Sequence, residues 1–111
     1  MDIAFRKRRL EKVFNSEKEL LKEYGKVKGR LIQRRMTFLR AAQCLADVPV
    51  EKPFRRHELR GKRKGQFALD LEQLYRLVFQ VNHNPIPRKE DGGIDLKSVT
   101  AITILGVEDY H

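Results

Sequence analysis

Apolar residues recur every three or four positions from about residue 5 to residue 46, the spacing that places side chains on one face of an α-helix. The pattern divides into two short segments and one longer one. Ser16, followed three residues later by Glu19, forms the arrangement of an N-terminal capping box, and Asn15 is the alternative N-cap. The apolar positions of the three segments are Leu10, Val13 and Phe14; Leu20, Leu21 and Tyr24; and Leu31, Ile32, Phe38, Leu39, Ala42 and Leu45.

After residue 54 the apolar positions alternate with polar ones, which is the period of a half-buried β-strand. Pro49 and Pro53 separate the two regimes and are expected to end the last helix, because proline cannot continue it. Glycines and a polar segment separate the alternating runs. The four predicted strands are residues 55–61, 66–71, 74–81 and 99–107.

Helices followed by strands, with hairpin-length connections, predict an α+β fold. We expect a single domain, residues 1–111, in which N-terminal helices pack on one face of a mainly antiparallel four-stranded sheet. The other face would be open and would present Arg76, Gln80 and the chain end. The side of the long helix that faces away from the core would carry Arg30, Arg34, Arg35 and Arg40.

Charge narrows the choice of partners. The 111-residue chain has 24 Lys and Arg against 15 Asp and Glu, a formal net charge of +9. Residues 1–50 hold 13 basic and six acidic side chains and residues 51–65 hold seven and two, whereas residues 66–111 hold four and seven. A positive potential over the first 65 residues would attract RNA, DNA, an anionic membrane surface or an acidic protein.

Several classes of site have no signal in the chain. The single cysteine, Cys44, cannot form an internal disulfide, and no apolar run is long enough to span a membrane. The start of the chain lacks the apolar segment of a signal peptide, so we expect a soluble cytoplasmic protein. Cys44 and the three histidines match no zinc motif, and Gly61 and Gly65 are too close for a phosphate-binding P-loop, so no metal or cofactor is expected.

Residues 55–65, "RRHELRGKRKG", hold the densest run of cations, seven in eleven residues if His57 is counted. Lys62, Arg63 and Lys64 would lie at a hairpin tip, where they reach phosphates or merely form a solvated turn. Arg76 lies within an otherwise apolar strand. It is a candidate clamp for phosphate, because a guanidinium binds two phosphate oxygens at once, or else an exposed arginine on the polar face of the sheet.

The chain closes with Asp109, Tyr110 and His111, three side chains able to transfer protons. The adjacent α-carboxylate favours the charged form of His111, which would suit proton donation to a leaving oxygen. The alternative is an ordinary disordered tail. His57 has the same parity as Leu59, so it is either a catalytic group or a core histidine with its hydrogen bonds satisfied.

Together the two helical segments, "HELRGKRKGQFAL" (57–69), "YRLVF" (75–79) and the final "EDYH" resemble the HigB group of toxins in the RelE/ParE superfamily. These proteins are the toxins of bacterial type II toxin–antitoxin modules. The resemblance covers essentially the whole chain and implies a RelE-like fold. It also implies a ribosome-dependent mRNA endoribonuclease that acts without metal and inhibits translation.

The resemblance implies roles for individual residues. His57, Asp109, Tyr110 and His111 would be catalytic. From the chemistry of RNA cleavage without a metal, we expect His57 or Asp109 to be the base, Tyr110 to position the substrate and His111 to be the acid or charge stabiliser. Arg76 would hold the scissile phosphate. Further contacts to the RNA backbone would come from Arg60, Lys62, Arg63 and Lys64.

Two features depart from the family pattern. Segment 83–98, with a Gly-Gly pair and mixed charge, replaces a short connection, either as a partner-binding element or as a passive insertion. Arg60 stands where the family often has lysine, which rules out a general base at this position because arginine does not lose its proton.

The resemblance also implies partners: a HigA-like antitoxin, the ribosome and its mRNA, and operator DNA bound by the toxin–antitoxin pair, with no membrane. The alternative is a non-catalytic protein of the RelE/ParE fold, either a gyrase-inhibiting toxin or a nucleic-acid-binding regulator. A protein that only binds has no need of the closing Asp-Tyr-His, so this segment discriminates between the two functions.

Overall fold

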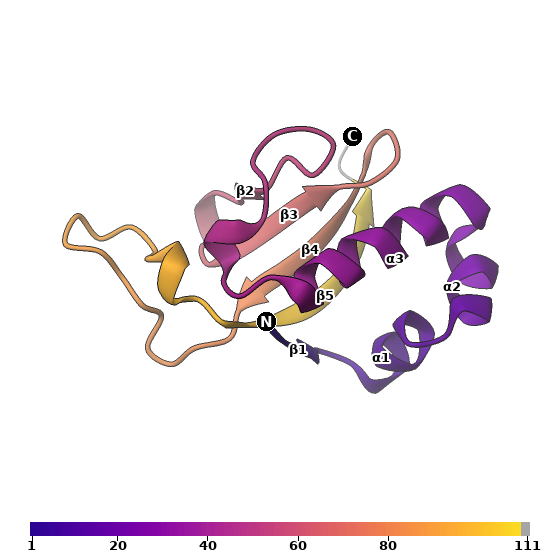
Figure 1. Ribbon diagram of the computed structural model, residues 1–111, viewed down its shortest axis with the longest axis horizontal. Coiled ribbons are helices and arrows are strands. Elements are labelled where there is room, and N and C mark those ends of the chain that lie inside the picture. The colour runs from indigo at the N-terminus through magenta and orange to yellow at the C-terminus, as the bar shows by residue number, and fades with distance from the viewer. Residues whose placement is uncertain (110–111) are drawn as a thin grey trace.

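The computed structural model describes residues 1–109, in which three helices precede the main part of a five-stranded sheet. The strand order is β1-β5-β4-β3-β2, and every neighbouring pair is antiparallel except β1 and β5, which are parallel. The predicted α+β class is confirmed. Figure 1 shows α3 lying across the sheet, with α1 and α2 beyond one end of it and segment 83–98 projecting from the other. The elements are β1 (Asp2–Phe5), α1 (Arg8–Phe14), α2 (Glu17–Tyr24), α3 (Lys26–Ala41), β2 (His57–Glu58), β3 (Gln66–Asp70), β4 (Tyr75–Val81) and β5 (Ala101–Asp109).

The sheet differs from the predicted one at both edges. The first residues add a fifth strand, because β1 pairs with β5 from Asp2 opposite Ala101 onward. At the other edge, β2 has two residues rather than the predicted seven. Arg55 has a left-handed backbone, with φ of 47°, so the strand cannot begin there as predicted. At the other end, the 3₁₀ turn that begins at Gly61 stops it from continuing.

The predicted N-cap of the second helix is confirmed, but the last helix is shorter than predicted. Ser16 is the N-cap of α2, and its Oγ accepts a hydrogen bond from the Glu19 N–H at 3.2 Å. Helix α3 ends at Ala41, well before Pro49, because Ala42 already adopts extended backbone. Leu45 instead lies in a separate 3₁₀ turn, Leu45–Asp47, where it is fully buried.

The main core fills the space between α3 and one face of the sheet, here called the core face. Side chains from the inner side of α3 meet alternate residues of β3, β4 and β5, as the two periodicities require. Phe67 and Phe79 stack with ring centroids 6.0 Å apart. The fully buried members of this core are Leu20, Ile32, Met36, Leu39, Leu45, Val48, Leu69, Leu77, Phe79, Val99, Ile102 and Ile104.

Two residues of α3 lie where the helical pattern did not place them. Arg35, predicted on the solvent side, is only 4% exposed. Its Nε donates to the Asp70 carbonyl at 2.9 Å, and its guanidinium lies 4.6 Å from the centre of the Phe54 ring. Burial lowers the pKa of Arg35, although the charge of Asp70 opposes that shift. Phe38, predicted within the apolar stripe, is 37% exposed, and its ring lies against Phe54.

The opposite side of the sheet, here called the turn face, is not left open as predicted. Residues 59–65 fold back over it, and a small apolar cluster forms beneath them. Segment 83–98 is partly built into the protein, since its Ile94 is buried in the main core. In residues 1–109 no helix is both long and apolar enough to cross a membrane. The cluster on the turn face consists of Leu59, Ala68, Val78 and Leu105.

Candidate nucleic-acid interface

Two arginines and a glutamate meet on the turn face near the end of β5. Arg63 binds the Glu108 carboxylate with both terminal nitrogens, Nη1 to Oε1 at 2.7 Å and Nη2 to Oε2 at 2.6 Å. Arg76 Nη2 donates to Glu108 Oε1 at 3.3 Å. The carboxylate therefore lies between two guanidinium groups, and we call these three residues the Arg–Glu–Arg cluster.

Strand register and the 3₁₀ turn bring the cluster together. Arg76 of β4 is directly opposite Glu108 of β5, so their side chains rise from the same face of the sheet. Arg63 comes from the 3₁₀ turn Gly61–Arg63, and its Nε donates to Gln66 Oε1 at 2.8 Å. This bond directs the guanidinium of Arg63 back across the sheet toward β5.

The cluster is half-buried and carries a net positive charge. The exposed fractions of the side chains are 16% for Arg76 and 35% for each of Arg63 and Glu108. Hydrogen bonds from Arg63, and then its charge and the contact with Arg76, lower the pKa of Glu108 against the opposing effect of burial. The hydrogen bond to Glu108 raises the pKa of Arg63. At neutral pH the cluster is thus two cations on one anion.

Such a cluster has the donor geometry of a phosphate site. Guanidinium groups bind carboxylate and phosphate oxygens with the same bidentate pattern. A phosphodiester that approached Arg63 or Arg76 would compete with the Glu108 carboxylate for the same N–H groups. Glu108 therefore sets how readily the two arginines bind an anion from outside.

The cationic turn divides into structural and exposed members. Arg55 forms a bidentate pair with the Asp70 carboxylate, with contacts of 2.7 and 3.0 Å. Arg56 donates to the carbonyl oxygens of Leu45 and Val48 and holds the preceding loop. Three of the predicted RNA-binding residues remain exposed and form no ion pair with any residue of 1–109: Arg60, Lys62 and Lys64.

His57 lies on the turn face but away from the cluster. It is opposite Ala68 of β3, which is in turn opposite Val78 of β4, so β2 is two strands from Arg76 and three from Glu108. At roughly 4.8 Å per strand, these separations are roughly 10 and 14 Å. Its Nδ1 is 2.8 Å from the Arg55 carbonyl oxygen. Because a carbonyl only accepts, Nδ1 holds the proton and the neutral ring has its lone pair on Nε2.

The structure places one of the three closing residues. Asp109 is the last residue of β5 and is opposite Tyr75, so by strand alternation it faces away from Glu108. Its side chain is exposed. Tyr110 and His111 lie outside the described residues.

The sequence reasoning missed Glu108 and Gln66. Glu108 stands directly before the predicted catalytic segment, so its position near the site was visible. Its pairing with Arg63 was not, because that contact spans 45 residues and depends on the fold of the turn.

No family model matches the chain, and no curated protein is significantly similar to it in sequence. What the structure supports is the α+β fold with N-terminal helices and a mixed five-stranded sheet. That the chain is a HigB-like toxin therefore stays a prediction from its sequence motifs.

Proposed function

We propose that this protein is the toxin of a type II toxin–antitoxin module and cleaves mRNA on the ribosome in the cytoplasm. The observation that supports this best is the Arg–Glu–Arg cluster, in which Arg63 of the cationic turn and Arg76 of β4 meet Glu108 near the end of β5. The resemblance to HigB toxins supplies the reaction, and the positive field of residues 1–65 suits a ribosomal target.

Cleavage of RNA without a metal proceeds by attack of a 2′-hydroxyl on the adjacent phosphate. A base removes the hydroxyl proton, cations stabilise the charge that develops on the phosphate, and an acid protonates the departing 5′-oxygen. In our proposal Arg76 and Arg63 hold the phosphate once Glu108 has released them. His111 acts as the acid and Tyr110 positions the substrate.

His57 and Asp109 are the candidate bases. His57 shares the turn face with Arg76 and has the tautomer that leaves Nε2 able to accept a proton. For His57 to act as the base, the 2′-hydroxyl next to the phosphate held by Arg76 must lie on the β2 side of that phosphate, within reach of Nε2. Asp109 is nearer along β5 but belongs to the other face by alternation, so we favour His57.

Partners follow from the same proposal. A HigA-like antitoxin would neutralise the protein, and the pair would bind operator DNA. Arg60, Lys62 and Lys64, which are exposed around the turn, would contact ribosomal or messenger RNA backbone.

One observation favours the alternative of a non-catalytic binding protein. Arg63 and Arg76 both already contact the Glu108 carboxylate. A protein that inhibits gyrase or binds nucleic acid would use the exposed turn and leave this cluster as a structural ion-pair network.

A comparison of variants in bacteria separates the two functions. Wild type, His111→Ala and Arg8→Ala would be induced, and the 5′ ends of translated messages would be mapped. For a nuclease we expect new ends within codons, about hundredfold fewer in His111→Ala, and unchanged in Arg8→Ala, which alters an exposed cation on α1. Growth arrest without new ends, equal in wild type and His111→Ala, would leave only the binding function.

A further inference from the structure

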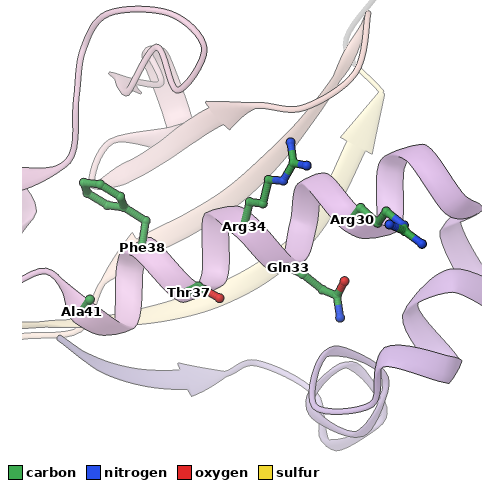
Figure 2. A pocket seen from close by; sticks show the side chains of 6 residues that line it. All are labelled: Arg30, Gln33, Arg34, Thr37, Phe38 and Ala41. Atoms are coloured by element: carbon green, nitrogen blue, oxygen red, sulfur yellow. The ribbon is translucent and has the colours of Figure 1, made fainter.

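The outer side of α3 carries a shallow hollow of about 500 Å³ that the proposed reaction does not use. Figure 2 shows its lining residues along the exposed side of this one helix, with Phe38 and Ala41 toward its C-terminal end. Their spacing of three and four residues makes a continuous stripe, which we call the α3 outer stripe. It consists of Arg30, Gln33, Arg34, Thr37, Phe38 and Ala41.

The N-terminal half of the stripe is cationic. Arg30 and Arg34 are one turn apart and exposed, and neither forms an ion pair within residues 1–109. Helix α3 contains no acidic residue that could neutralise them. Arg35, the next residue, is directed inward to the Asp70 carbonyl. The stripe therefore offers two adjacent guanidinium groups to an anionic partner.

One end of the stripe is apolar, and an exposed valine lies just beyond the other end. Phe38 is 37% exposed, and its ring lies against Phe54 with the centroids 4.8 Å apart. Ala41, one turn further, is also exposed. At the opposite end Val27, three residues before Arg30 on the same side of the helix, is 59% exposed. Apolar groups thus lie on both sides of the two arginines along one side of α3, so a single helix from a partner could cover all of them.

We propose that the α3 outer stripe binds an acidic amphipathic helix of a partner protein. Two carboxylates one turn apart on that helix would pair with Arg30 and Arg34, since residues three or four apart share a helix face. Apolar side chains on the same face would cover Phe38 and Ala41 at one end and Val27 at the other.

The apolar groups favour a peptide over RNA as the occupant. RNA-binding grooves combine cations with aromatic rings on which bases stack. Val27 and Ala41 offer neither a ring nor a side-chain hydrogen bond, and Phe38 is the single aromatic residue of the stripe. An amphipathic helix buries all three.

The stripe and the Arg–Glu–Arg cluster are on opposite sides of the sheet. The inner residues of α3 pack on the core face, whereas the cluster rises from the turn face. A helix on α3 would therefore leave the cluster accessible, and the inference does not depend on the proposed nuclease activity.

Selection from a display library of random 16-residue peptides against the full chain tests the proposal. We expect the enriched peptides to carry two acidic residues three or four positions apart, with apolar residues on the same face. Arg34→Glu should weaken their binding at least tenfold, whereas the matched reversal Arg8→Glu on α1 should change it less than twofold. Circular dichroism would show that both variants are folded.

A charge swap in the strongest peptide separates direct contact from an indirect effect. Replacing its acidic pair by lysine should restore binding to the double variant Arg30→Glu/Arg34→Glu and abolish binding to wild type. The proposal is wrong if the selected peptides bind Arg34→Glu as well as wild type, if none is enriched, or if the swap restores nothing. The proposal is also wrong if Arg34→Glu weakens the binding of a 16-nucleotide single-stranded RNA but leaves peptide binding unchanged. The stripe would then be a nucleic-acid site.

Discussion

The two faces of the sheet contrast in how they treat charge. On the core face a large apolar cluster excludes water, and Arg35, the one charged side chain buried within residues 1–109, is held by main-chain carbonyl groups. On the turn face four apolar residues form a small patch, and the Arg–Glu–Arg cluster remains partly solvated beside it. Stability and polar chemistry are thus separated in this fold, so charges on the turn face can change partners without opening the main core.

Matched truncations measure this separation most directly. Leu77→Ala on the core face should lower the free energy of unfolding by about 4 kcal/mol, because Leu77 is fully buried in the main core. Leu105→Ala on the turn face should cost about 2 kcal/mol, since Leu105 belongs to a cluster of four residues and is 9% exposed. Urea denaturation of both variants would give the two values. Equal losses would show that the turn face contributes as much to stability as the core face.

Two neighbouring arginines of α3, one buried and one exposed, allow the same comparison for single charges. Arg35→Leu should destabilise the protein by about 2 kcal/mol, because the Asp70 carbonyl loses its donor in a half-buried position. Arg34→Leu should change stability by less than about 0.5 kcal/mol, since Arg34 is exposed. Thermal unfolding of the two variants would compare them, and an equal effect would contradict the structural role of Arg35.

Glu108→Gln probes the turn face through pH. The cluster lowers the pKa of Glu108, so the stabilisation is fully present above the ordinary value of about 4.3 and is lost as the pH falls through the folded value. At pH 7 the variant should be less stable by about 1 kcal/mol or less, because the pair is partly exposed. Denaturation at pH 7 and pH 3 should show the difference shrinking in acid. A difference of the same size at both values would mean that the Glu108 charge does not stabilise the fold.

Lys28→Met gives the smallest expected effect. The Lys28 ammonium lies 3.4 Å from the centre of the Tyr75 ring and joins α3 to the start of β4. Loss of this cation–π contact should cost about 0.5 kcal/mol, whereas Lys26→Met, at an exposed position, should be neutral. Chemical denaturation would compare the free energies of unfolding of the two variants. A Lys28→Met variant more stable than wild type would show that burying the methionine side chain outweighs the lost cation–π contact.

Local features of the fold were accessible from the sequence. The α+β class, the Ser16 cap and the alternating strands β3, β4 and β5 follow from periodicity and capping, which depend on residues a few positions apart. Strand β1 was missed, since four residues at the start of a helical pattern carry no clear alternation of their own. The turn and Arg76 were predicted to belong to one site, and in the structure Arg63 of the turn and Arg76 contact the same Glu108 carboxylate.

Only the tertiary structure decided which charges meet. The sequence determined that the turn is cationic and that Arg76 belongs to a strand. The fold directed Arg63 onto Glu108, turned Arg35 into the interior and set His57 two strands from Arg76. These contacts join residues that are tens of positions apart, and their geometry depends on strand register and packing. Neither is encoded in the local spacing of apolar and polar residues, so these pairings follow from the assembled sheet.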